Sequence, residues 1–156
     1  MSIQTITNYI RVSDRLSSSG QPDAGGFRCI AAAGFAAVIN LAMPDSDKAI
    51  PEEGGIVTAL GMVYHHIPVP FDEPKISHLT QFFELMDYLQ NEKVWVHCVL
   101  NYRVSAFLYL YRRWKGMSED EARIAVLPDW EPNATWRKFM IQPTDRVAAL
   151  PPFLSP

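Results

Sequence analysis

The sequence predicts one α/β domain in which a mainly parallel sheet of four to five strands is flanked by helices. Short apolar and β-branched runs alternate with longer runs of helical periodicity, and Pro and Gly separate them. The strand-like runs are too apolar to have a wet face, as expected of parallel strands covered on both sides. With 156 residues and 48% hydrophobic composition, the chain can fill one core without disulfide or metal support.

Charge and hydropathy exclude several partners. The chain has 14 Lys and Arg against 17 Asp and Glu, a formal net charge of -3, and its longest basic block is the pair Arg112-Arg113. This balance disfavours nucleic acid and anionic membranes as partners. No apolar run approaches the ~18 to 20 residues of a membrane span, and the first residues lack the basic start and apolar segment of a signal peptide. We therefore expect a cytoplasmic protein, and the sequence does not predict its oligomeric state.

The cysteines and histidines do not form a metal-binding pattern. Cys29 and Cys98 are the two cysteines, too few for a disulfide scaffold or a structural zinc site. Cys29 lies on the apolar side of a predicted helix, so we expect it to be an ordinary core thiol. His65 and His66 are neighbours in a predicted strand, so they point to opposite faces and cannot easily share an ion. We expect no metal and no cofactor.

The first half of the chain predicts two helices and two strands. After an extended start, Asp23 is a plausible N-cap and Gly34 a plausible C-cap for the first helix, and Pro51 opens the second. The predicted helices cover about 23–33 and 51–60, and the predicted strands 36–41 and 62–69. Prolines 68, 70 and 74 then enforce an extended loop.

The second half predicts a helix, a strand and three further helices. Apolar residues recur with helical spacing from Ile76 to Leu89, and a buried strand follows at 93–97. A tight loop separates that strand from a helix that starts near Arg103. Ser118 to Glu121 forms a capping box for a short helix, and the last helix covers 133–141 before a Pro-rich tail.

The loop from Cys98 to Arg103 carries the chemistry. It places a cysteine at a strand end and an arginine at the start of the following helix. The backbone amides of such a turn form an anion site, with the positive end of the helix dipole behind it. We expect the sulfur there to be substantially thiolate, its nucleophilic form. An Arg in the first helical turn opposes the dipole and calls for an anionic partner, which it can clamp through two donors.

These residues resemble the signature of the protein tyrosine and dual-specificity phosphatase superfamily, which is His-Cys, five residues, then Arg followed by Ser or Thr. Further segments are similar to the bacterial phosphatase-like domain of beta-lactamase-hydrolase-like proteins: Ser19-Gly20-Gln21-Pro22, Val38-Ile39-Asn40-Leu41, Ile67-Pro68-Val69-Pro70 and His97-Cys98. The resemblance covers most of residues 8–140. We therefore expect a single domain over 1–156, with a core at about 8–142 and a Pro-rich C-terminal tail.

The resemblance implies hydrolysis of phosphomonoesters through a phosphocysteine. Cys98 would attack phosphorus, Arg103 would hold the oxygens, and Ser105 would donate to the departing sulfur. Asp72, in the proline-rich loop, would protonate the leaving oxygen, with Glu73 or Asp129 as substitutes. Six neighbours would line the bound phosphate: His97, Val99, Leu100, Asn101, Tyr102 and Val104. A phosphorylated small molecule or phosphoprotein would be the partner, with a phosphate- or sulfate-type anion in the loop.

The loop departs from the signature by one residue, because four residues separate Cys98 from Arg103. An ungapped alignment puts Val104 in place of the signature Arg and Asn101 in place of its usual Gly. Asn tolerates the left-handed conformation that such a turn needs. A loop of this length is that of rhodanese-type sulfurtransferases, which is one alternative. A second alternative is a pseudophosphatase that binds oxyanions and hydrolyses poorly.

Overall fold

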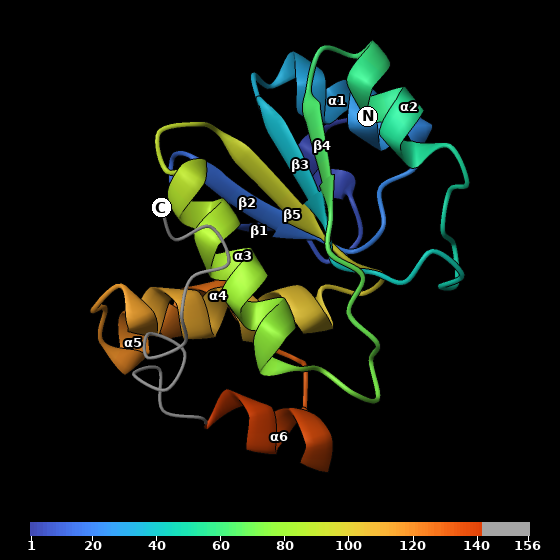
Figure 1. The fold of residues 1–156 in the computed structure, drawn as a ribbon. Helices are drawn as coiled ribbons and strands as arrows, with labels where there is room; N and C mark the ends of the chain where they lie inside the picture. The colour runs from blue at the N-terminus through green and yellow to red at the C-terminus, as the bar shows by residue number, and fades with distance from the viewer. Residues whose placement is uncertain (142–156) are drawn as a thin grey trace, which may run out of the picture.

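The computed structural model describes residues 1–141, in which a five-stranded sheet has the order β1-β2-β5-β3-β4 (Figure 1). The strands are β1 (Ile10–Arg11), β2 (Leu16–Ser19), β3 (Ala37–Asn40), β4 (Val63–His66) and β5 (Val94–His97). Only β1 pairs antiparallel, with β2, while the other three pairings are parallel. Parallel neighbours place their carboxyl ends at one edge of the sheet, where ligand sites of open α/β sheets lie.

Six α-helices connect and cover these strands. They are α1 (Ala24–Ala32), α2 (Glu53–Ala59), α3 (Ile76–Tyr88), α4 (Tyr102–Trp114), α5 (Glu119–Ala122) and α6 (Ala134–Met140). Asp23 caps α1 by accepting a hydrogen bond from the Gly26 amide, and Ser118 and Glu121 complete both bonds of a capping box at α5.

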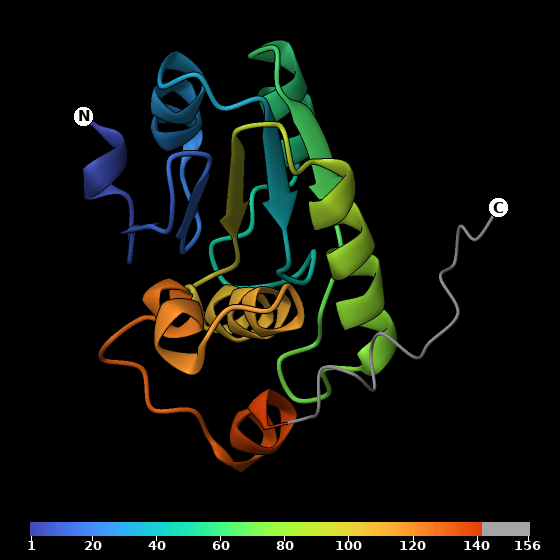
Figure 2. The same cartoon turned by 90° about the vertical axis from the view of Figure 1, so that its left-hand side faces the viewer.

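The helices form two layers, one on each face of the sheet (Figures 1 and 2). Successive residues of a strand point to opposite faces. Val38 and Trp95 therefore pack in a cluster with α1 and α2, whereas Ile39 and Val96 pack in a larger cluster with α3, α4 and α6. Burial on both faces explains why these strands are continuous apolar runs.

The predicted α/β architecture is confirmed, and each helix or strand predicted from periodicity exists within a few residues of its expected bounds. The exception is the segment before Gly20, which contains β1 and β2 although no strand was predicted there. Cys29 is half-buried rather than a core thiol, and its sulfur lies 3.3 Å from the Met1 carbonyl oxygen. The Pro-rich tail falls at 142–156, outside the described residues.

Two features are absent from the described residues. Between residues 1 and 141, no helix is long and apolar enough to cross a bilayer. The same part of the chain holds no group of three or more His, Cys, Asp or Glu side chains placed to bind a metal ion.

Candidate active site

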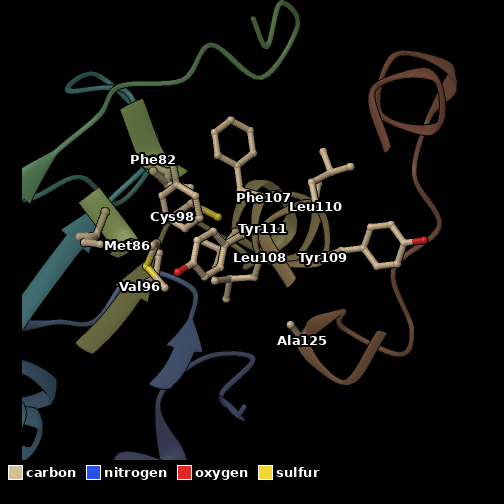
Figure 3. Close-up of a cluster of buried hydrophobic side chains, with 14 of the residues drawn as sticks. Phe82, Met86, Val96, Cys98, Phe107, Leu108, Tyr109, Leu110, Tyr111 and Ala125 are labelled. Atoms are coloured by element: carbon tan, nitrogen blue, oxygen red, sulfur yellow. The ribbon is translucent and has the colours of Figure 1, made fainter. Parts of the chain in front are cut away.

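Cys98 follows β5, the middle strand of the sheet, and precedes the loop that leads into α4. Its side chain is 1% exposed and belongs to the cluster between the sheet and α4, together with Val96 and Phe107 (Figure 3). A strand end followed closely by a helix start places the amino end of α4 next to the loop, where its unpaired amides and dipole favour an anion.

The carbonyl groups of this loop are bound from outside by the amino-terminal part of the chain. The Val99 carbonyl accepts the Gln21 amide at 2.9 Å, and the Leu100 carbonyl accepts the Asn8 side-chain amide at 2.9 Å. Gly20 makes this approach possible, because a Cβ at that position would overlap the Val99 carbonyl. The loop is thus held by hydrogen bonds from residues more than seventy positions earlier in the sequence.

Asn101 turns the loop into α4. Its φ is 70°, the left-handed region that the sequence predicts Asn to tolerate. Its side-chain amide donates to the Asn8 carbonyl and to the Ser18 hydroxyl, at 2.8 and 3.1 Å. Ser105 secures the same residue, because its hydroxyl donates to the Asn101 carbonyl at 2.6 Å and accepts the Leu127 amide. The Ser105 proton therefore goes to this carbonyl and not to the Cys98 sulfur as predicted.

The backbone amides of the loop remain free to bind an anion. From Val99 to Val104, no amide has an acceptor anywhere in residues 1–141. The Val99 and Leu100 carbonyls accept from Gln21 and Asn8, outside the loop, so they are not partners of the loop amides. Successive unpaired amides at a helix start form a concave anion site.

Arg103 lies beside this site. Its side chain is 6% exposed, its Nη1 donates to the Val69 carbonyl at 3.0 Å, and its guanidinium lies 5.7 Å from the centre of the Phe71 ring. Its Nε is buried with no acceptor within the described residues. A buried guanidinium with an unused donor needs an anion to complete its hydrogen bonding. Val104, in contrast, is fully buried in the core.

Cys98 and Arg103 line one cavity of about 400 Å³. Its wall comes from three segments: the loop after β3, the loop after β4, and the Cys98 loop with the first turn of α4. The lining residues are Met43, Asp45, Ser46, Asp47, Phe71, Cys98, Val99, Leu100, Tyr102 and Arg103. The size is typical of a small-molecule site.

Trp130, in the segment before α6, and Trp136, in α6, hold two parts of this wall. The Tyr102 ring stacks on Trp130 with centroids 5.2 Å apart and an interplanar angle of 7°. Trp136 packs against Phe71 and donates its indole N–H to the Phe71 carbonyl at 2.9 Å. The cavity therefore has a rigid aromatic side.

Behind the loop, His97 forms a buried pair with Glu53. The His97 Nε2 lies 2.6 Å from a Glu53 carboxylate oxygen, and its Nδ1 lies 3.1 Å from the Cys98 carbonyl oxygen. A neutral imidazole has one acceptor nitrogen, whereas both nitrogens here face oxygen atoms. Both contacts are hydrogen bonds when the imidazole carries two protons and Glu53 is a carboxylate.

The environment of Glu53 supports that ionisation state. Burial raises the pKa of this carboxyl group, but hydrogen bonds and charge from His97, with further hydrogen bonds from Gln21 and Tyr64, outweigh burial and lower the pKa below 4.5. The pair ties His97 both to α2, through Glu53, and to the Cys98 carbonyl, so it fixes the start of the loop. Burial, with the nearby Glu53 charge, raises the pKa of Tyr64 to about 12, so that residue stays a neutral hydroxyl.

The structure brings only part of the predicted site together. Five predicted residues line the cavity: Cys98, Val99, Leu100, Tyr102 and Arg103. Five do not: Asp72 is exposed, Val104 is in the core, His97 faces Glu53, and Asn101 and Ser105 brace the loop. The backbone amides of Asn101 and Val104 have no acceptor within the described residues, and neither residue lines the cavity. The predicted substitute acids, Glu73 and Asp129, also lie outside the wall.

Three residues near the site were not predicted. Glu53 pairs with His97 across 44 positions, and no local pattern separates it from Glu52. Asp45 and Asp47 reach the cavity from the loop after β3. That loop follows the carboxyl end of a parallel strand, which is the signal that could have found them.

The chain has a protein tyrosine phosphatase-like fold, with Cys98 at the end of the central parallel strand and a buried Arg103 in the first turn of the following helix. The chain is 33% identical to a protein from Shewanella putrefaciens CN-32 named "Putative phosphatase (DUF442)", with a TM-score of 0.79, and the match covers 94% of this chain and 95% of that one. The chain therefore belongs to the DUF442 family.

More distant structures share the fold. The catalytic domain of the PP-IP phosphatase SIW14 from S. cerevisiae is 16% identical with a TM-score of 0.72, and the match covers 92% of this chain and 90% of that one. P. aeruginosa TpbA, solved with pTyr, is 15% identical with a TM-score of 0.72, over 94% and 90%. Neither a protein-family model nor a curated protein sequence matches the chain.

Proposed function

We propose that this protein hydrolyses phosphomonoesters through Cys98. In the first step the Cys98 thiolate attacks phosphorus, the S–P bond forms, and the P–O bond to the alcohol breaks, with the alcohol oxygen taking a proton from an acid. In the second step water attacks phosphorus and gives a proton to the conjugate base of that acid, and the S–P bond breaks, which releases phosphate and restores both the thiolate and the acid.

The observation that carries this proposal is the shared cavity of Cys98, Arg103 and the free loop amides. Three nonbridging phosphoryl oxygens need several donors that are fixed before the reaction. The amides from Val99 to Val104 supply neutral donors, and Arg103 supplies a charged one. Although the loop is one residue shorter than the phosphatase signature, Cys98 and Arg103 line the same cavity, which supports this proposal.

Asp72 remains our candidate for the general acid. Its neighbour Phe71 lines the cavity, and the Asp72 side chain is exposed beside it. An Asp72→Asn variant should lose activity mainly on alkyl phosphates, whose leaving oxygen needs the proton, and much less on 4-nitrophenyl phosphate. Equal losses of activity on both substrates would show that Asp72 is not the general acid.

The function itself is tested with 4-nitrophenyl phosphate between pH 5 and 7.5. Cys98→Ser should lower kcat at least about a thousandfold, because serine is a far poorer nucleophile here. Cys29→Ser is the matched control, and it should keep wild-type kcat because Cys29 lies on α1, away from the cavity. Mass spectrometry of the rapidly quenched wild-type enzyme should find a phosphoryl group on Cys98.

Two outcomes would contradict the proposal. Thiocyanate formation from thiosulfate and cyanide, with a persulfide on Cys98 and no phosphate release, would make the protein a sulfurtransferase, as the loop length allows. Phosphate binding without either reaction would make it a pseudophosphatase.

A further inference from the structure

We infer that the cavity selects phosphomonoesters whose organic part is aromatic and neutral or cationic, and that it rejects substrates with further negative charge. The inference rests on the proposed hydrolysis by Cys98 and concerns which esters that site accepts. It is carried by two carboxylates on the cavity wall that the proposed reaction does not use.

The charges of the cavity wall are unbalanced once phosphate is bound. Among the described residues, Arg103 is the one cationic side chain that lines the cavity, whereas Asp45 and Asp47 are both anionic. The loop amides and Arg103 are the groups that bind the phosphoryl oxygens. The two carboxylates are therefore left to face the rest of the substrate.

Within residues 1–141 these two carboxylates have no ion-pair partner, and Lys48, which follows Asp47 in the sequence, does not line the cavity. Both side chains are exposed at the cavity mouth, so their ionised forms remain hydrated at little cost. A second anionic group on the substrate would approach two like charges, while a cationic group would approach two opposite charges.

The remaining wall fits a flat apolar group. Tyr102, held by its stack on Trp130, and Phe71, held by Trp136, present ring surfaces, and Met43 adds an adaptable thioether side chain. Aromatic rings prefer stacked or edge contacts with other rings, and an ammonium group gains further from facing them. The cavity thus combines aromatic surface with negative charge.

Three aryl phosphates with para substituents of different charge test the inference: 4-(aminomethyl)phenyl, 4-ethylphenyl and 4-(carboxymethyl)phenyl phosphate. A methylene group separates each charge from the ring, so the leaving groups are similar in chemistry. Release of inorganic phosphate gives kcat/KM at low ionic strength, where surface charges are least screened. We expect kcat/KM to fall from the cationic to the anionic ester by at least tenfold.

Variants without the two carboxylates test whether Asp45 and Asp47 cause this order of kcat/KM values. Asp45→Asn/Asp47→Asn should reduce the difference between the cationic and anionic esters to less than threefold. The matched control is Asp14→Asn/Glu92→Gln, which removes the same charge from exposed positions beyond the amino ends of β2 and β5, at the opposite edge of the sheet. This control should keep the wild-type difference.

Equal kcat/KM values for the three esters would overturn the inference and leave the proposed hydrolysis standing. A tenfold difference that survives in the Asp45→Asn/Asp47→Asn variant would also overturn it. Absence of turnover for all three esters would overturn the hydrolysis itself.

Discussion

Removal of the Glu53 carboxylate should destabilise the protein and weaken catalysis together. Glu53→Gln keeps the shape of the side chain but leaves the fully buried His97 imidazole without its carboxylate partner. Loss of one member of a buried pair costs about 3 to 5 kcal/mol, and because Gln still offers an oxygen acceptor we expect a smaller loss, about 2 kcal/mol. For a chain of this size that lowers Tm by about 4 to 8 °C.

The pH dependence of the stability loss distinguishes removal of the Glu53 carboxylate from a packing defect. The pKa of Glu53 is lowered in the folded protein, so its contribution to stability is present above the unfolded pKa near 4.5 and is lost as pH falls through the lower folded pKa. The difference between wild type and Glu53→Gln should thus be full at pH 6 to 7 and should shrink below about pH 4. Urea unfolding at several pH values measures it.

Catalysis supplies the second readout. With the bond between His97 and the Glu53 carboxylate weakened, the Cys98 carbonyl that His97 contacts is less well held, and kcat/KM on 4-nitrophenyl phosphate should fall several-fold. Glu52→Gln is the matched control, because Glu52 is exposed and its side chain makes no capping bond. Equal stability of Glu53→Gln and Glu52→Gln at pH 7, or an unchanged kcat/KM, would refute the reasoning.

Two further substitutions test how the loop and the cavity wall are held. Gly20→Ala should lower the free energy of unfolding by about 1 to 3 kcal/mol and weaken vanadate binding, because the new Cβ overlaps the Val99 carbonyl. Gly55→Ala, where a Cβ meets nothing within 4 Å, should do neither. Equal vanadate affinity of the two variants would contradict the bracing role of Gly20. Trp136→Phe removes the hydrogen bond to the Phe71 carbonyl and should lower stability by about 1 kcal/mol and kcat/KM several-fold. Unchanged kcat/KM would show that this bond does not position the wall.

The sequence predicts β3 and β5, which are buried through their own apolar residues, and misses β1 and β2. β3 and β5 carry Val, Ile and Trp, which mark a doubly covered strand. In β2, Leu16 is followed by three serines, which read as a loop. These serines are buried because the tertiary structure satisfies them, as when Ser19 accepts the Trp95 indole N–H at 2.8 Å.

The residues of the candidate site likewise divide into those that have a local sequence signal and those that only the fold brings together. Cys98 and Arg103 could be found because a strand end and a helix start bracket them locally. Glu53 could not, because its partner His97 lies 44 positions away and only the fold joins them. The roles of Asn101 and Ser105 were visible as a turn former and a hydroxyl, but their partners depend on how β2 and the segment after α5 are placed.

The outer bracing of the Cys98 loop makes the first residues of the chain part of the active site. Asn8 bonds both to the Leu100 carbonyl and to the Asn101 side chain, although neither contact builds a strand or a helix. Trimming the chain to begin at β2 would preserve the parallel strands and remove these two bonds. A form that begins at β2 should therefore fold yet bind anions in the loop more weakly, so variants made for assay should retain Asn8.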